Sequence, residues 1–380
     1  TLTLSTDYQY YSGGYYYYYD HSYSGSITGT ISIVKAGPYT QSLSGNSSFT
    51  GTVQINGGVL GADSTNALSS SNGVISFANG AFLRYGNTVD YSGRFSQASG
   101  QLYSIDIYNR SVTWNTQLAG TIGLYLRDTY TNAGVLTLAP SALNSFTNGI
   151  TLNSGFLALG NTNAIDHHGT ISFTGGTLRF TSGNTSDYSD QFSNSGNQTY
   201  RVDVYGQTVN FANSLSSSGG SFALYDNYTG AVGTLTFSTA NSYTAGTTIY
   251  SGTLKLQDSG GLPASRNVSV QGGTLDINGK TPSVGSVTLY NAQIIDSASS
   301  KGTLTATGYS VTTTSSALAS ANLAGASAGL TFSGYSGTLT LSGVNTYGGG
   351  TLINNYGTIL LGSNDGLPSG KDLNIHVGYL

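Results

Sequence analysis

One block of sequence recurs four times in this 380-residue chain, roughly every hundred residues. The two best-preserved copies are Gly233–Pro263 and Gly337–Pro368, and looser copies lie around Ser42–Leu68 and Val135–Ile165. A fixed period punctuated by glycine-rich turns is typical of a stacked array of coils rather than of a single globular core. Such an array exposes a long lateral surface and functions without a catalytic pocket.

Four glycines occupy equivalent places in the four blocks. They are Gly58, Gly155, Gly252 and Gly357, so the successive steps are 97, 97 and 105 residues. Each stands directly before an alternating apolar segment, where we expect a turn with positive φ or a close contact that tolerates no side chain. We therefore interpret these glycines as structural turns.

The repetition extends well beyond the opening block. Ile75–Ser96 resembles Ile171–Ser193 residue by residue, and the similarity continues through the strands that follow. We therefore expect one continuous solenoid built from tandem units of about 97 residues. Its predicted segments are a tyrosine-rich N-terminal segment in degenerate repeat (1–41), unit 1 (42–138), unit 2 (139–235), a divergent unit 3 (236–336) and a partial unit 4 (337–380).

Strict alternation of apolar and polar residues predicts many short strands, for example Thr234–Ser238, Thr253–Leu256 and Thr274–Ile277. The turn residues between them are Gly, Asn and Ser, and helical spacing of apolar residues is weak throughout. The copies follow one another without a Pro-rich or charged linker, which favours coil-on-coil stacking over separate sandwiches. The predicted fold class is all-β, a parallel β-helix (β-solenoid) with almost no helix.

Composition excludes several functions. Charged residues make up 7% of the chain and the net charge is −4, so we expect no nucleic-acid partner. No apolar run approaches the ~20 residues of a membrane-spanning helix. The chain has no Cys, which excludes disulfides, thiolate metal sites and a Cys nucleophile, and which suits an exported bacterial protein.

The repeated block carries a resemblance to a known family. The segment from Leu235 to Leu254, and likewise Leu339–Leu361, resembles the autotransporter-associated β-strand repeat of bacterial autotransporter passenger domains. Leu43–Leu60 matches in part, with Phe49 in place of the tyrosine, and Lys35 stands in a similar Lys-x-Gly lead. The resemblance implies a right-handed parallel β-helix presented outside the cell or on the bacterial surface, and it implies no particular activity.

The acidic residues recur from copy to copy, which argues against catalysis. The recurring pairs are Asp90 and Asp187, Asp106 and Asp203, and Asp128 and Asp226. A catalytic carboxylate is expected once, whereas a ladder of carboxylates is expected to bond turns. We therefore predict no catalytic, cofactor-binding or metal-binding residues and no enzymatic activity.

The histidines and the candidate calcium loop likewise indicate no metal site. His167 and His168 are adjacent in a turn and His21 and His376 stand apart, so we predict no shared metal. Ser363–Gly366 is interpreted as a turn rather than a calcium loop. No cofactor is expected.

Tyrosine is the one unusual signal, with 29 residues in the chain. A core cannot hold every ring of the N-terminal cluster, because alternate side chains of a strand face opposite sides. Exposed tyrosines favour contact with partners or sugars, while stacking along the solenoid surface is the simpler alternative. The candidate contact surface consists of Tyr8, Tyr10, Tyr11, Tyr15, Tyr16, Tyr17, Tyr18, Tyr19 and Tyr23.

The predicted function is that of a non-enzymatic extracellular β-solenoid that builds surface structure or mediates adhesion. Thr1–Ser5 repeats the pentapeptide Thr338–Ser342, and the chain stops within another repeat strand. Because open coils favour strand addition, we expect self-association, head-to-tail or lateral, or contact with the adjoining part of a longer chain. Host or cell-surface glycans are further candidate partners. The alternatives are a β-helix enzyme acting on polysaccharides and a glycan-binding module that uses tyrosine.

Overall fold

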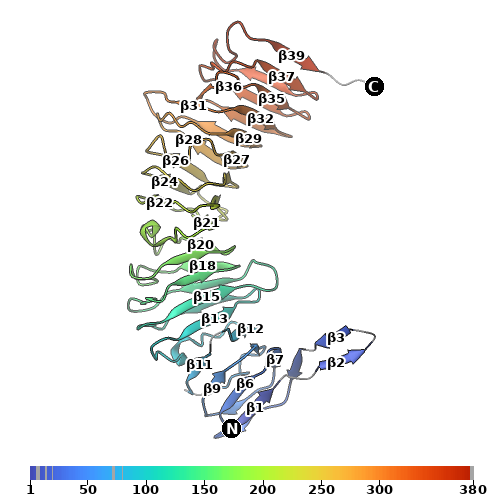
Figure 1. The fold of residues 1–380 in the computed structure, drawn as a ribbon, viewed down its shortest axis with the longest axis vertical. Coiled ribbons are helices and arrows are strands. Elements are labelled where there is room, and N and C mark those ends of the chain that lie inside the picture. The colour runs from blue at the N-terminus through green and yellow to red at the C-terminus, as the bar shows by residue number, and fades with distance from the viewer. Residues whose placement is uncertain (6–8, 13–14, 19, 71–72, 79, 377–380) are drawn as a thin grey trace. The chain divides into compact units, whose positions relative to one another are not determined.

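The computed structural model describes residues 1–5, 9–12, 15–18, 20–70, 73–78 and 80–376, with side chains described outside residues 6–19. The chain divides into two units, Thr1–Asn184 and Thr185–Leu380. In each unit, successive coils of a β-solenoid stack through parallel strand pairs (Figure 1). The two units together contain about 17 turns, so the predicted all-β parallel solenoid is confirmed.

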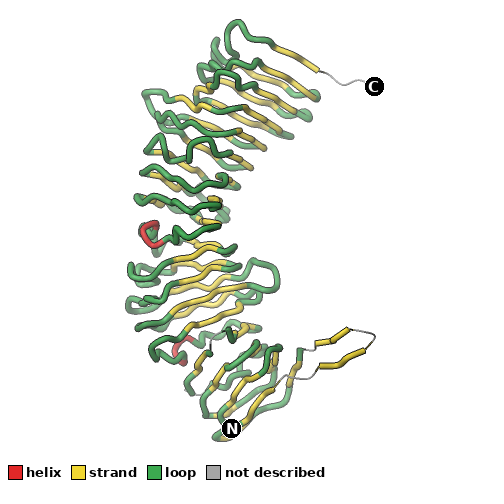
Figure 2. Tube along the Cα trace, in the orientation of Figure 1, coloured by secondary structure: helices red, strands yellow, loops and turns green. Residues whose placement is uncertain are grey.

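Short strands alternate with turns and loops along the first unit, as the yellow and green segments of Figure 2 show, and its longer parallel ladders are three. The strands of the eight-stranded sheet are, in spatial order, β4 (His21–Tyr23), β7 (Thr40–Leu43), β10 (Val59–Ala62), β12 (Phe82–Tyr85), β13 (Leu102–Asp106), β15 (Gly123–Arg127), β17 (Ile150–Leu152) and β19 (Ile171–Phe173). The four-stranded sheet contains β1 (Leu2–Ser5), β6 (Ile33–Ala36), β9 (Val53–Ile55) and β11 (Ile75–Phe77). The third ladder contains β14 (Ser111–Trp114), β16 (Val135–Leu138), β18 (Phe156–Leu159) and β20 (Thr177–Arg179).

Smaller elements complete the first unit. A short parallel pair joins β5 (Thr28–Gly29) to β8 (Ser48–Phe49), and a 3-10 turn covers Ser92–Arg94. The strands β2 (Gln9–Ser12) and β3 (Tyr15–Tyr18) pair antiparallel with one another as a hairpin. The first unit therefore combines parallel coils with an antiparallel hairpin in the tyrosine-rich segment.

Two long parallel ladders form the second unit. One contains β21 (Thr199–Asp203), β23 (Ser221–Tyr225), β25 (Thr247–Ile249), β27 (Val268–Gln271), β29 (Ser286–Tyr290), β32 (Gly308–Thr312), β35 (Leu330–Ser333), β37 (Thr351–Asn354) and β39 (Leu373–His376). The other contains β22 (Thr208–Phe211), β24 (Thr234–Phe237), β26 (Thr253–Leu256), β28 (Thr274–Asp276), β30 (Gln293–Ile295), β33 (Ser316–Ala319), β36 (Thr338–Leu341) and β38 (Thr358–Leu361). A short pair joins β31 (Thr303–Thr305) to β34 (Asn322–Ala324), and a 3-10 turn covers Ser189–Gln191.

Apolar and polar side chains alternate along each strand, so the apolar ones face the core and the polar ones face the surface. Leu235, Leu254 and Leu275 stand in register on adjacent coils, and each is 0% exposed. The threonine that precedes each leucine forms a parallel row on the outer side, where it is half-buried. Like residues stack on like residues because parallel neighbours lie in register, about 4.8 Å apart.

The coil is shorter than the sequence repeat and varies in length. Register partners are 19 residues apart between Thr40 and Val59 and 26 apart between Leu124 and Ile150. Gly58 precedes β10 in the eight-stranded sheet, but its equivalent Gly155 precedes β18 in another ladder. The step of 97 residues is therefore not a whole number of coils in the first unit.

Helical structure is almost absent, as expected from the sequence. Among the residues that the structure describes, the helical elements are the two 3-10 turns, and no helix is long and apolar enough to cross a membrane.

Candidate functional site

Three pairs of stacked aspartates form the most regular polar feature of the solenoid. In each pair a lower aspartate ends one strand and an upper aspartate stands about one coil later in the chain. We call these pairs the first, second and third aspartate corners. Their members are Asp106 and Asp128, Asp203 and Asp226, and Asp276 and Asp296.

A tight turn follows each lower aspartate. In the first corner, Tyr108 and Asn109 both have positive φ, of 46° and 56°, and the N–H of Arg110 donates to the carbonyl of Ile107 at 2.9 Å. Tyr205 and Gly206 repeat this geometry, with φ of 47° and 76°. Two successive positive φ values with a bond from residue 4 to residue 1 define a type I′ turn. The third corner has the same turn at Asn278 and Gly279, with φ of 47° and 74°.

The lower aspartates bond the following coil. Asp106 accepts the backbone N–H of Thr129 at 3.1 Å and its hydroxyl at 2.7 Å. Asp203 accepts the backbone N–H of Asn227 at 3.1 Å and its side-chain amide at 2.9 Å. Both carboxylates are buried, at 1% and 0% exposed. Each therefore joins two adjacent coils from within the wall of the solenoid.

The upper aspartates accept hydrogen bonds from the coil that precedes them in the chain. The Asp128 carboxylate accepts the N–H of Asn109 in the coil below at 3.0 Å and that of Gly134 in its own loop at 2.7 Å. Asp226 repeats these contacts with Gly206 and Gly233, at 2.7 and 2.6 Å. Because each carboxylate accepts N–H groups from both its own loop and the turn below, these bonds close the loop and fix that turn.

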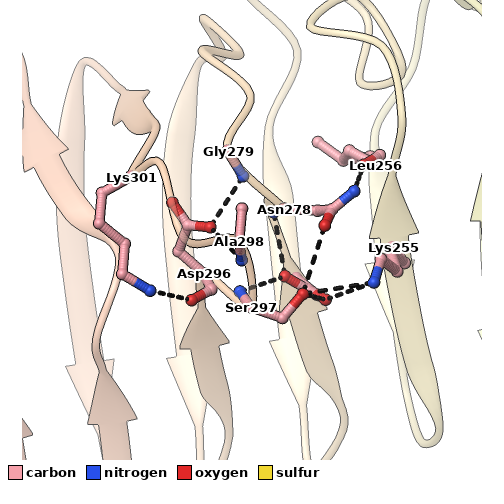
Figure 3. Close-up of polar contacts among 9 residues, drawn as sticks. Lys255, Leu256, Asn278, Gly279, Asp296, Ser297, Ala298 and Lys301 are labelled. Atoms are coloured by element: carbon pink, nitrogen blue, oxygen red, sulfur yellow. Dashed lines mark hydrogen bonds and ion pairs between the residues drawn. The ribbon is translucent and has the colours of Figure 1, made fainter.

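Figure 3 shows the third corner, in which Asp296 accepts the N–H groups of Gly279 at 2.7 Å and Ala298 at 3.0 Å. Ser297 donates its hydroxyl to Asp276 at 2.6 Å, and Lys255 lies 3.7 Å from the same carboxylate. This corner was not predicted from the sequence, because Asp276 follows Asp203 by 73 residues rather than 97, so alignment of the copies does not place it beside the other two lower aspartates. The available signal was the pattern of aspartate, branched apolar residue, any residue, then Asn or Gly, which the three lower aspartates share.

The other recurring aspartates also bond turns. Asp90 accepts the N–H of Ser92 at 2.8 Å and that of Asn115 at 2.9 Å. Asp187 accepts the equivalent N–H of Ser189 at 2.8 Å. In these positions the carboxylate oxygens face backbone donors rather than a groove, an arrangement that fits turn bonding better than proton transfer to a substrate.

The histidines lie at the surface where they are described. His168 directs Nδ1 to Asp166 Oδ2 at 3.0 Å, with its side chain 74% exposed. His21, in β4, and His376, in β39, are exposed. The described residues contain no group of three or more His, Asp or Glu side chains placed to hold one metal ion.

The four equivalent glycines stand directly before β10, β18, β26 and β38. Gly58, Gly155 and Gly252 have positive φ, of 56°, 75° and 73°. A Cβ on Gly252 would lie 2.9 Å from Cβ of Asp226, the upper aspartate of the second corner. Gly357 lies against Phe332 and Gly334, so a Cβ there would lie 2.6 Å from Gly334 Cα. Absence of a side chain thus lets each chain segment pass close to its neighbour.

The N-terminal tyrosines are only partly described. Tyr8 and Tyr19 lie outside the described residues, as do the side chains of Tyr10, Tyr11, Tyr15, Tyr16, Tyr17 and Tyr18. Tyr23, in β4, is 46% exposed.

Other tyrosines belong to the core. Tyr243 and Tyr347, in the two best-preserved blocks, are 0% exposed and share hydrogen bonds with Thr247 at 2.6 Å and Thr351 at 2.8 Å. Phe49 takes the corresponding place in the first block and is also 0% exposed. Burial raises the pKa of both tyrosines above the ordinary value.

Comparison with known families identifies the repeated block. The passenger-associated-transport-repeat model matches the chain four times, at residues 33–62, 129–159, 226–256 and 335–361. These repeats are typical of autotransporter passenger domains, so the chain is an autotransporter passenger-like β-solenoid. Searches of curated proteins and of solved structures each gave no match.

The matched segments relate directly to the corners. The second match begins at Thr129, the partner of Asp106, and the third begins at Asp226. In these two matches the repeat thus includes the loop closed by the upper aspartate, Asp128 or Asp226, and the glycine turn that follows it.

Proposed function

We propose that this chain is an extracellular, non-enzymatic solenoid that is displayed at a bacterial surface and serves a structural or adhesive role. The observation that carries the proposal is the combination of four passenger-associated transport repeats with a parallel solenoid wall. Such a wall offers a long lateral surface, which suits contact rather than catalysis.

The bonding of the acidic residues supports a non-enzymatic role. Glycan-cleaving enzymes need a carboxylic acid and a carboxylate that face the scissile bond. Here the corner aspartates are engaged by backbone N–H groups of adjacent coils. They are therefore poor candidates for such chemistry, and the rival function as a polysaccharide-cleaving enzyme receives less support.

Self-association, head-to-tail or lateral, is a further part of the proposal, because a solenoid of stacked coils offers a long lateral surface for contact with a second chain. Sedimentation velocity of the purified chain tests this directly, and concentration-dependent association is expected. A chain that stays monomeric at high concentration would contradict self-association.

Surface display is tested by placing the chain between a secretory signal peptide and an autotransporter translocator in a laboratory bacterial host. We expect the chain to reach the surface of intact cells, where added protease removes it, and the cells to adhere or aggregate more than cells carrying the translocator alone. A chain that remains protected from protease in intact cells would contradict the proposal. Release of reducing ends from polysaccharides, lost in Asp106→Ala with Asp203→Ala, would favour the enzymatic rival.

A further inference from the structure

Two of the three aspartate corners carry tyrosine at a position where the backbone disfavours it. Tyr108 and Tyr205 have φ of 46° and 47°, in the left-handed region. A bulky side chain is rarely found there, whereas Asn and Gly adopt this conformation readily. The third corner has Asn278 at the same place with φ of 47°. The turn therefore forms without tyrosine, and tyrosine at this position costs stability.

A second tyrosine faces the first across one coil. The rings of Tyr108 and Tyr130 have centroids 5.1 Å apart at an interplanar angle of 55°. The rings of Tyr205 and Tyr228 repeat this arrangement, at 5.3 Å and 60°. We call these two pairs the corner tyrosines. The third corner has Ala298 in place of the second tyrosine, with the same aspartate bonds beneath it.

The upper ring of each pair is accessible to solvent. Tyr130 is 64% exposed and Tyr228 is 47% exposed, while Tyr108 and Tyr205 beneath them are half-buried. Tyr108 is held in place from the side, because the Arg84 guanidinium lies 4.6 Å from its ring centre and also bonds Asp63 at 3.1 Å. A ring that is fixed and still reachable from solvent is prearranged for contact with a ligand.

The first corner is also hollowed. A surface hollow of about 420 Å³ is lined by Tyr108, Asn109, Arg110 and Tyr130. This volume is within the range of small-molecule sites, and two aromatic rings beside a few polar groups are the usual lining of such sites. Arg110 and Asn109 are both exposed beside the rings.

We propose that the corner tyrosines bind sugar rings of a glycan, and that Arg110 makes the first corner prefer a sugar with a carboxylate. A hexose ring has an apolar face that packs on tyrosine and a polar rim that accepts and donates hydrogen bonds. The guanidinium pairs with a carboxylate in a fixed planar geometry. The second corner has Gln207 in the place of Arg110, so it takes neutral sugars without this preference.

The hollow and the small extent of each ring pair favour a saccharide over a protein partner. A protein interface buries a broad area around its aromatic anchors, whereas each corner presents one ring pair on a narrow turn. The inference adds a ligand class to the adhesive role proposed above. It rests on that proposed function in one respect, namely that the solenoid is exposed outside the cell, where glycans are present.

The test is a titration of the purified full chain with two probes, the tetramer of α-1,4-linked galacturonic acid and maltotetraose, followed by NMR of the tyrosine ring resonances. We expect saturable binding with dissociation constants on the order of 1 mM, which is the affinity of a small contact area. The acidic probe should bind the first corner about tenfold more tightly than the neutral probe. Absence of saturable binding by both probes would overturn the proposal.

The third corner supplies matched variants. Tyr108→Asn with Tyr130→Ala replaces the ring pair of the first corner by the two residues that the third corner has there, and we expect the fold to be kept while binding there falls at least about tenfold. Arg110→Gln should reduce the affinity for the acidic probe to that for the neutral probe. The reverse change, Asn278→Tyr with Ala298→Tyr, should add a binding corner.

Tyr290, 46% exposed in β29 and outside the corners, provides the control, and Tyr290→Ala should leave binding unchanged. Binding that survives loss of both ring pairs, or that falls equally in Tyr290→Ala, would overturn the assignment. The titration uses purified protein, so it is independent of the surface-display experiment. Absence of sugar binding would not contradict surface display, and failure of surface display would not contradict sugar binding.

Discussion

The Asp106 carboxylate at the end of β13 accepts both the backbone N–H and the hydroxyl of Thr129, which belongs to the next coil. The side chain is 1% exposed, so water does not replace these bonds when they are lost. One residue thereby holds two coils in register at the point where the second passenger-associated transport repeat begins.

Replacement of Asp106 by alanine should destabilise the first corner by about 1–3 kcal/mol, because buried N–H and hydroxyl donors lose their acceptor. Hydrogen exchange at the Thr129 amide should accelerate markedly, while amides in the second unit keep their protection. Local exchange is the appropriate measurement, since long repeat arrays do not always unfold in one step. An unchanged exchange rate at Thr129 would contradict the assigned role. Asp106→Asn, which keeps one oxygen acceptor, should be less damaging.

Substitutions at Gly252 and Gly100 should distinguish the cost of backbone strain from the cost of steric crowding. Both have positive φ, of 73° and 83°, but a Cβ on Gly252 would lie 2.9 Å from Asp226, whereas a Cβ on Gly100 would meet no heavy atom within 4 Å. Gly100→Ala should cost about 1 kcal/mol from strain alone. Gly252→Ala and Gly252→Val should cost about 2–4 kcal/mol, because overpacking adds to the strain. Equal shifts of the urea midpoint in Gly100→Ala and Gly252→Ala would contradict a separate contribution from crowding.

Trp114 and Tyr85 should be energetically coupled. The Trp114 indole N–H donates to the Tyr85 hydroxyl at 3.0 Å, and both side chains are 0% exposed. The equivalent residues in the next copy are Phe211 and Phe180, which form no such bond. Trp114→Phe alone removes a partner of a buried hydroxyl, so Trp114→Phe with Tyr85→Phe should cost less than the two single changes added together. A double-mutant cycle should give a coupling of about 1 kcal/mol, and strict additivity would count against it.

Buried tyrosines should make the solenoid sensitive to alkali. Burial raises the pKa of Tyr200 to about 12, whereas an unfolded tyrosine ionises near ~10. A raised pKa in the folded chain contributes stability that is fully present below pH ~10 and is lost as the pH rises toward about 12. The unfolding midpoint should therefore fall over this interval.

Tyr200→Phe tests the source of that sensitivity. The variant loses the hydrogen bond from the Tyr200 hydroxyl to the Ser193 carbonyl, 2.7 Å long, so it should be less stable by about 1 kcal/mol at neutral pH. Its stability should then fall less steeply above pH ~10 than that of the parent chain. The same slope in both proteins would show that Tyr200 does not contribute.

Much of the local structure is readable from the sequence. The alternation in Thr234–Phe237 and Thr253–Leu256 predicts which side chains face the core, because a strand has a period of two in any sheet. The glycines before β10, β18 and β26 mark positive φ, because other residues are strained there. The tandem copies likewise indicate a parallel stack, since strands joined in the same order and pattern meet in register.

Tertiary structure alone decides which residues meet across coils. Gly58 and Gly155 look equivalent in sequence but precede strands of different ladders, because coils of 19 to 26 residues do not divide 97 evenly. Asp276 and Asp296 form a third corner that lies off the 97-residue step, so comparison of the copies does not reveal it. The contact between Tyr108 and Tyr130 also depends on coil length. The number of residues in the loops of a coil determines which residue of the next coil lies beside a given side chain.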